Sequence, residues 1–224
     1  MERCDFLPVS AEEMHERGWW WYDALVVGGD AYVDHPSFGT AVISRVLEAE
    51  GLRVAVLAQP DWHDAEAFRA MGRPRLGVFI GAGNLDSMVA HYTAAKRRRS
   101  EDFYSPGKRS GCRPDRAAIV YCNRAREAFG PDMPIILGSL EASLRRFAHY
   151  DYWDDSVRRA ILFDAPADLL VYGMGEAATI EIAHRLKKKQ SVRTMTDIPG
   201  TGYIARDPSV CKFDHITLPS FEDV

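Results

Sequence analysis

Five short apolar runs alternate with segments of helical periodicity along most of this 224-residue chain. Each run is apolar almost throughout rather than at every second position, which is typical of parallel strands buried on both faces. The helices between them would return the chain in right-handed crossovers. We therefore predict an α/β fold with a doubly wound, mostly parallel sheet and helices on both faces. The strands are expected within residues 23–29, 53–59, 75–83, 133–139 and 167–173.

The helical segments show apolar residues at helical spacing and end signals such as glycine or lysine. Beyond residue 190 this periodicity ends, and only residues 202–205 could add a short strand at the edge of the sheet. Helices or helical pieces are expected within residues 40–51, 64–71, 113–130, 140–147, 154–162 and 176–189.

Polar residues follow glycine at the carboxyl ends of four predicted strands. In a doubly wound sheet this edge is where ligands and partners bind. Glycine is common in any single turn of this kind because it lets the backbone bend. Four such turns on one edge, however, predict a surface that faces a substrate or a partner. The residues assigned to this surface are Asp30, Tyr32, Asp34, His35, Asn84, Asp86, Ser139, Glu141, Gly173, Gly175 and Glu176.

A long insertion, residues 84–115, separates the third predicted strand from its helix. Ordered insertions on the ligand edge are commonly lids, so we expect this one to fold across the strand ends. Its basic run, Lys96, Arg97, Arg98 and Arg99, lies near tyrosines and could contact an anion such as a phosphate or single-stranded RNA. The simpler alternative, which we favour, is a solvated helix end that the following acidic residues partly neutralise.

Known cofactor and metal motifs are absent or misplaced. Gly173-x-Gly175-x-x-Ala178 matches the dinucleotide fingerprint formally, but it follows the last strand, and Glu176 would meet the pyrophosphate. No Walker A motif is present, and the acidic stretch 149–155 lacks metal-ligand spacing, so no metal site is predicted. His35 beside Asp34 could form an acid–base pair. The favoured alternative is that this histidine orders the bend by hydrogen bonding.

The composition of the chain argues against several classes of protein. The net charge of −4 argues against general nucleic-acid binding, although local basic patches could still bind it. No apolar run approaches the roughly 20 residues of a membrane span, and the N-terminus lacks a secretory signal. The cysteines are far apart in sequence and form no Cys-x-x-Cys motif. We therefore expect a soluble cytoplasmic protein with reduced thiols and no membrane contact. The four cysteines are Cys4, Cys112, Cys122 and Cys211.

Six longer motifs point to one family. They are FLPVSAEEM, GDAYVDHPSFG, AQPDW, YTAAKRRRSEDFYSPG, GSLEASLRRFAHYDYWDDSVRRAIL and DLLVYGMGE. On these motifs the chain, from about Phe6 to its end, resembles the N-terminal domain of the YgiQ family (UPF0313) of radical SAM proteins. The resemblance implies a flavodoxin-like α/β unit, similar to a cobalamin-binding domain, that precedes a radical SAM barrel.

In that family the barrel holds a 4Fe-4S cluster on a Cys-x-x-x-Cys-x-x-Cys motif and cleaves S-adenosylmethionine; the resemblance implies no particular substrate. This chain lacks the motif, so we expect it to bind no cluster and to be catalytically silent alone. We expect residues 1–190 to form the α/β domain and residues 191–224 to be a connector towards the barrel, its partner.

Related cobalamin domains carry Asp-x-His-x-x-Gly, whose histidine ligates cobalt. Around His35 the aspartate and the glycine are each displaced by one position, which disfavours cobalamin. Two functions stay open at this point. One is an accessory domain that covers or gates the barrel's active site, and the alternative is a stand-alone nucleotide- or RNA-binding module.

Overall fold

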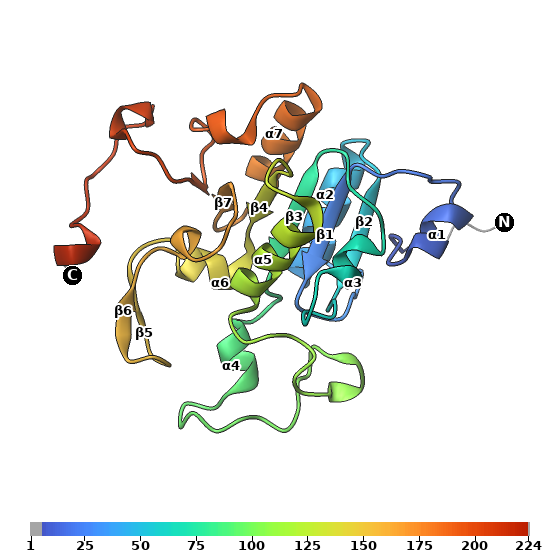
Figure 1. The fold of residues 1–224 in the computed structure, drawn as a ribbon, viewed down its shortest axis with the longest axis horizontal. Helices are drawn as coiled ribbons and strands as arrows, with labels where there is room; N and C mark the ends of the chain where they lie inside the picture. The colour runs from blue at the N-terminus through green and yellow to red at the C-terminus, as the bar shows by residue number, and fades with distance from the viewer. Residues whose placement is uncertain (1–5, 224) are drawn as a thin grey trace.

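The computed structural model describes residues 6–223, and its centre is a six-stranded sheet (Figure 1). The strand order is β2-β1-β3-β4-β7-β8, in which the first five strands run parallel and β8 is antiparallel to β7. This is the flavodoxin-type order, so the predicted fold class is confirmed. The strands are β1 (Ala24–Gly28), β2 (Val54–Ala58), β3 (Gly77–Gly81), β4 (Ile135–Leu137), β7 (Leu169–Val171) and β8 (Thr201–Gly202).

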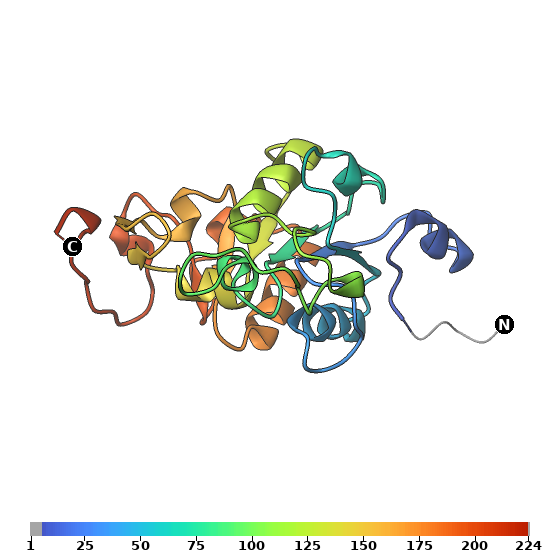
Figure 2. The same ribbon diagram turned by 90° about the horizontal axis from the view of Figure 1, so that it is seen from below.

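Helices cover both faces of the sheet, with α3 and α5 on one side and α2 and α7 on the other (Figure 2). Neighbouring residues of one strand supply both cores: Leu25 packs with the α3 and α5 side chains, and Val26 packs towards α2 and α7. Since side chains alternate across a strand, both faces must be apolar, which explains the continuous apolar runs. The helices are α1 (Ala11–Glu16), α2 (Gly39–Ala49), α3 (Glu66–Arg69), α4 (Ser87–His91), α5 (Ala117–Phe129), α6 (Ser139–Leu144) and α7 (Glu176–Lys187).

The segment 154–162 does not form the helical piece that its pattern predicts. Instead β5 (His149–Asp151) and β6 (Ser156–Arg158) make an antiparallel hairpin apart from the main sheet. The Asp151 carboxylate accepts two backbone N–H groups of the turn at 2.9 and 3.4 Å, and Arg116 donates to it at 2.8 Å. Aspartate often bonds its own backbone in this way, and these bonds turn the chain before a helix can begin.

The insertion, residues 84–115, contains only α4 and one short 3₁₀ helix, Pro106–Lys108. It lies along the carboxyl edge of the sheet, below the strands in Figure 1. The backbone N–H of Ala31, just after β1, donates to the Tyr104 carbonyl at 2.8 Å. The structure therefore attaches the insertion to the edge that the sequence analysis selected.

Packing on the sheet continues past residue 190. Three side chains that follow α7 are buried in the core on the α2 and α7 side: Val192, Met195 and Ile198. Strand β8 then pairs with β7 at the predicted edge position. The remaining residues extend away from the sheet, and their short 3₁₀ helices are Pro208–Val210 and Phe221–Asp223 (Figure 2). Within residues 6–223, no helix has the length and apolar character needed to cross a membrane.

Candidate functional site

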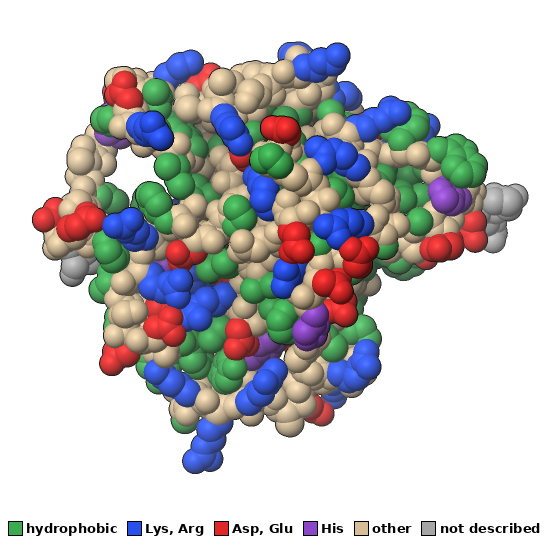
Figure 3. Space-filling model, viewed as in Figure 1, with side chains coloured by type: hydrophobic (Ala, Val, Ile, Leu, Met, Phe, Trp, Pro, Cys, Tyr) green, Lys and Arg blue, Asp and Glu red, His purple; other side chains and the backbone are tan. Residues whose placement is uncertain are grey.

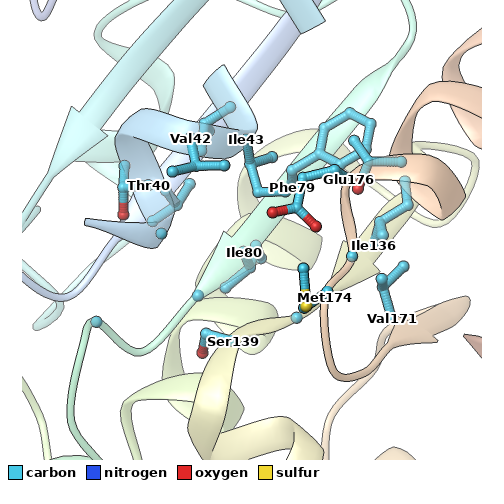
Figure 4. A pocket seen from close by; sticks show the side chains of 18 of the residues that line it. Thr40, Val42, Ile43, Phe79, Ile80, Ile136, Ser139, Val171, Met174 and Glu176 are labelled. Atoms are coloured by element: carbon cyan, nitrogen blue, oxygen red, sulfur yellow. The ribbon is translucent and has the colours of Figure 1, made fainter. Parts of the chain in front are cut away.

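A cavity of about 270 Å³ opens at the carboxyl ends of β1, β3, β4 and β7 (Figure 4). It lies between the N-terminal ends of α2 and α7. At their other ends these helices meet, where His184 Nε2 lies 2.7 Å from Glu50 Oε2. The cavity therefore reaches the sheet at the end where the two helices leave it uncovered. Its apolar wall includes Val26, Val42, Ile43, Phe79, Ile136 and Val171, and the backbone at Gly173 and Gly175 borders it.

Four polar side chains line this cavity: Thr40, Ser139, Glu176 and Thr179. Ser139 is the second residue after β4 and the first of α6, and it has a φ of 74°, a left-handed conformation that serine rarely adopts. Its Oγ accepts a hydrogen bond from the backbone N–H of Ala82 at 3.1 Å. This bond ties β3 to the start of α6 and offsets a conformational cost of about 1–2 kcal/mol. The strained residue is thus held at the cavity wall by its neighbour strand.

Glu176 is the charged residue of the cavity wall. It is the first residue of α7, and its carboxylate projects towards Ile43 of α2 (Figure 4). Among residues 6–223 no hydrogen bond or ion pair engages this carboxylate. Glu176 lies in the first turn of α7, where the helix dipole favours a negative charge. The cavity consequently combines an apolar interior with one carboxylate whose oxygens can accept hydrogen bonds from a ligand.

The neighbouring crevice, between the ends of β1 and β3, is filled by side chains instead. Arg113 enters it from the insertion and is 1% exposed. Its guanidinium lies 2.8 Å from Asp30 Oδ1 and 2.8 Å from Asp102 Oδ2. Burial raises the pKa of Asp30, and the nearby Arg113 charge opposes that shift. Asp30 is therefore buried and anchors the insertion, although the sequence analysis assigned it to a surface facing a substrate or partner.

Two glycines make this filled crevice possible. A Cβ on Gly29 would lie 2.0 Å from the Ala82 carbonyl oxygen, so the strand ends approach too closely for any side chain there. Gly83 has a φ of 110°, and its Cβ would lie 2.3 Å from Asp30 Oδ1. These two glycines allow the backbone to pack closely. This is the simpler explanation that the sequence analysis gave for glycine at any single strand end.

Glu141 and Asp86 also lie away from the surface to which the sequence analysis assigned them. Glu141 is 1% exposed, and its two oxygens accept the backbone N–H groups of Ser87 at 2.8 Å and Ala118 at 3.0 Å. Asp86 caps α4 and forms an ion pair with Arg145. Burial raises the pKa of the Glu141 carboxyl. Both acids were expected at a binding edge, but orphan N–H groups at helix starts recruit them into the interior.

The bend after β1 is held by two of the predicted residues. His35 is exposed, and its Nδ1 accepts the backbone N–H of Ser37 at 3.1 Å. Asn84 accepts the N–H of Gly39 at 3.3 Å and donates to the Ser37 carbonyl at 2.9 Å. These contacts match the favoured alternative for His35, a residue that orders the bend, and they join the loops after β1 and β3.

Asp34 and Tyr32 lie on the same bend. Asp34 forms an ion pair with Arg45 of α2. Tyr32 is half-buried, and burial is the main cause that raises its pKa to about 12. Of the predicted edge, the structure therefore brings Ser139, Gly173, Gly175 and Glu176 to the cavity and places Tyr32, Asp34, His35 and Asn84 on the adjoining bend.

The basic run of the insertion is partly occupied by internal contacts. Lys96 donates to the Trp153 carbonyl at 3.2 Å, and Arg99 donates to backbone carbonyls at 3.1 and 3.2 Å. Arg97, Arg98 and Arg99 line an open groove of about 600 Å³. Anion contact by this run stays a prediction.

The described cysteines do not fit an iron–sulfur cluster. Within residues 6–223 no three His, Cys, Asp or Glu side chains are grouped for a metal. Cys122 is fully buried, which raises the pKa of its thiol and disfavours the thiolate that a metal needs. Cys112 and Cys211 are partly exposed and far apart in sequence, and Cys4 lies outside the described residues. A 4Fe-4S cluster requires closely spaced thiolates, so these residues offer no ligand set.

Sequence reasoning missed Arg113 and the cavity itself. An arginine in the stretch GCRPD carries no periodicity that distinguishes it from its exposed neighbours. The cavity depends on where α2 and α7 diverge, and apolar strand residues look the same whether a helix covers them or not. The glycine-rich strand ends were the one sequence signal that pointed to the edge where the cavity lies.

Together, the sheet order and the cavity define a doubly wound α/β domain of the flavodoxin type with a ligand-sized space at its carboxyl edge. Residues 6–224 match the family model described as Radical SAM N-terminal, and the chain belongs to this family. The UPF0313 protein of Clostridium botulinum (strain 657 / Type Ba4) is 55% identical over 224 residues, covering 100% of this chain and 35% of that protein. A UPF0313 protein of Clostridium perfringens (strain SM101 / Type A) is 52% identical, covering 100% of this chain and 34% of that protein.

The predicted resemblance is thus confirmed, and the chain spans about a third of the length of the curated relatives it matches. Among solved structures, the radical S-adenosylmethionine methyltransferase TsrM from Kitasatospora setae, with cobalamin and a 4Fe-4S cluster bound, is 20% identical with a TM-score of 0.49. The match covers 82% of this chain and 27% of that chain. The expectation that this chain binds no cobalamin stays a prediction.

Proposed function

We propose that this chain is the accessory domain of a radical SAM enzyme and that its carboxyl edge packs over the active site held by the rest of that enzyme. The observation that carries the proposal is a set of exposed apolar side chains beside this edge, here called the α6 apolar surface. It consists of Leu140, Leu144, Phe147, Phe163, Tyr172 and Met174.

The exposure of this surface is large for such side chains: 60% for Leu144, 53% for Phe147 and 90% for Met174. Arg146 bridges part of it, with its guanidinium 4.7 Å from the Phe147 ring centroid and 5.1 Å from that of Tyr172. In Figure 3 hydrophobic and basic side chains intermingle over the region that Figure 1 assigns to α6 and the β5–β6 hairpin. Phe147, Phe163 and Tyr172 line one open groove. Exposed apolar surface with a polar rim is typical of a protein–protein contact.

The rest of the protein is the occupant that fits this surface. The curated relatives are about three times as long as this chain, so most of such a protein lies outside the domain. The 4Fe-4S cluster and S-adenosylmethionine that the family implies belong, in this proposal, to that larger part. The insertion and the α6 apolar surface flank the carboxyl edge and would cover or gate the site, and the residues after β8 would serve as the connector.

Hydrogen exchange on the full-length protein and on the 224-residue chain tests this proposal. Backbone amides of α6 and of the loop at Tyr172–Gly175 are expected to exchange more slowly in the full-length protein. The double variant Leu144→Asp, Met174→Asp should remove this protection and reduce the formation of 5′-deoxyadenosine. The control is Trp20→Asp, at a 79% exposed side chain in the loop after α1. Protection confined to the α1 side of the molecule would contradict the proposal.

The alternative, a stand-alone RNA-binding module, has less support. Its best observation is the groove lined by Arg97, Arg98 and Arg99, but Arg99 already donates to two backbone carbonyls. Binding of single-stranded RNA that weakens steeply with salt and depends on Arg97 and Arg98 would favour it.

A further inference from the structure

The cavity between α2 and α7 opens at the same edge as the α6 apolar surface and shares Met174 with it, but the rest of its lining differs and points to a small molecule. We propose that it binds the base of a purine nucleoside of the guanine type: a flat bicyclic ring with adjacent N–H donors and no phosphate near it. This inference concerns a ligand of the domain itself and does not depend on docking to the rest of the protein.

The size of the cavity sets the size of the ligand. A buried apolar cavity of about 150 Å³ accommodates benzene. The volume here is about 270 Å³, which is room for two fused rings rather than one. Val26, Phe79 and Ile136 are each at most 5% exposed yet line the cavity, so the space extends down to the sheet. An apolar slot of this depth suits a flat aromatic ring more than a hydrated polar molecule.

The charge at the cavity determines which bicyclic ring is expected to bind. The Glu176 carboxylate has no partner among residues 6–223 and faces the same space as Ile43 and Phe79 (Figure 4). A carboxylate can accept two parallel N–H bonds, and the guanine edge offers such a pair in its ring N–H and exocyclic amine. Adenine presents a ring nitrogen acceptor beside its amine, which would repel the carboxylate. A phosphate in the same space would be repelled more strongly.

The other polar groups complement a guanine base. Thr40 and Ser139 place hydroxyl groups at the cavity wall, from α2 and from the start of α6. Ser139 Oγ already accepts the Ala82 N–H, so its own proton is available to a carbonyl oxygen of a ligand. The left-handed backbone of Ser139 keeps that hydroxyl at the wall. The cavity thus offers both an acceptor and donors, around an apolar interior.

Isothermal titration calorimetry with guanosine, inosine, adenosine and guanosine 5′-monophosphate tests the proposal on the full-length protein. Guanosine should bind most tightly. Inosine lacks the exocyclic amine, and it should bind about tenfold more weakly because one charge-assisted hydrogen bond is lost. Adenosine and the monophosphate should bind more weakly still. Equal affinity for guanosine and adenosine would overturn the proposal, as would no binding of any of the four.

Two variants locate the site. Glu176→Gln should weaken guanosine binding about tenfold, while Glu16→Gln, at an exposed acid of α1, should not change it. Gly138→Val should abolish binding by filling the cavity. A Cβ there meets only the Val171 carbonyl oxygen, at 3.6 Å, so the fold is expected to tolerate the change. Circular dichroism checks that tolerance, and Glu176→Gln tests the site independently of it.

Guanosine binding that both variants leave unchanged would place the ligand elsewhere and overturn the proposal. A structure of the full-length protein with a segment of its own chain in the cavity would also overturn it. Unchanged hydrogen exchange at α6 would contradict the docking proposal but would not affect the guanosine result. The two proposals can therefore fail separately.

Discussion

Two crevices lie side by side at the carboxyl edge of this sheet, and the chain uses them in opposite ways. Between β1 and β3 the crevice is closed by Arg113, which lies between the carboxylates of Asp30 and Asp102. Between α2 and α7 the space stays open, with Glu176 at its wall and no side chain of the described residues across it. Glycines follow the strands at both crevices, yet the first crevice is filled by side chains and the second is open.

The comparison shows that glycine and acidic residues at strand ends do not by themselves mark a ligand site. Asp30 and Glu141 are buried and bonded to the protein, whereas Glu176 has no partner among residues 6–223. What separates them is whether another element supplies donors. The insertion supplies Arg113 to Asp30, and helix starts supply N–H groups to Glu141. No described element supplies a donor to Glu176.

The largest effect is expected from breaking the closed crevice. Arg113→Leu leaves Asp30 and Asp102 buried without their cation, which should lower the free energy of unfolding by about 3–5 kcal/mol. Urea denaturation at pH 7 measures this. Arg159→Leu removes an exposed ion pair with Glu222 and should cost at most about 1 kcal/mol. Equal losses in the two variants would contradict the role given to Arg113.

A matched pair of glycine substitutions compares the effect on stability at the two crevices. Gly29→Ala forces a Cβ against the Ala82 carbonyl oxygen in the closed crevice and should cost about 1–3 kcal/mol. Gly39→Ala, at the open cavity, meets nothing within 4 Å and should raise stability by about 0.4–1 kcal/mol, because alanine restricts the unfolded chain. Thermal unfolding of both variants gives the comparison, and a stabilising Gly29→Ala would refute the close approach.

The buried acid gives a pH-dependent prediction. Burial raises the pKa of Glu141 in the folded state above its ordinary value of 4.5. Its contribution to stability is therefore present below that value and is lost as pH rises through the raised pKa. Glu141→Gln should cost about 1–3 kcal/mol at pH 5, since its amide can accept only one of the two N–H groups. The deficit should narrow towards pH 8 in urea titrations. A deficit that widens with pH would show that the carboxylate is stabilised in its ionised form.

The smallest effect is expected at the open crevice. Glu176→Gln breaks no contact among the described residues and removes only a favourable charge at the start of α7. The free energy of unfolding should fall by about 0.3–0.5 kcal/mol at low salt. Chemical denaturation at low and high salt measures this. A loss above about 2 kcal/mol would mean that Glu176 has a structural partner, and the contrast with Asp30 would fail.

The sequence by itself determined the fold class, the family and the edge of the sheet at which the cavity lies. Continuous apolar runs such as residues 24–27 are needed only where both faces of a strand are covered, so the pattern specifies the layers directly. Glycine after a strand likewise reports a local backbone need. The edge strand after residue 200 was predictable because its pattern is also local. These features depend on neighbours within a few residues.

Tertiary structure decided which edge residues are available. Whether Asp30 is buried depends on an arginine 83 positions further along the chain, and whether Glu141 is buried depends on the helix starts at Ser87 and Ala117. The hairpin at 149–158 depends both on local bonds of Asp151 to the turn backbone and on Arg116, which lies 35 positions earlier in the chain. A carboxylate at a strand end looks the same in sequence with or without a distant donor. Only the folded chain shows where that donor arrives, because burial of a charge is set by long-range partners.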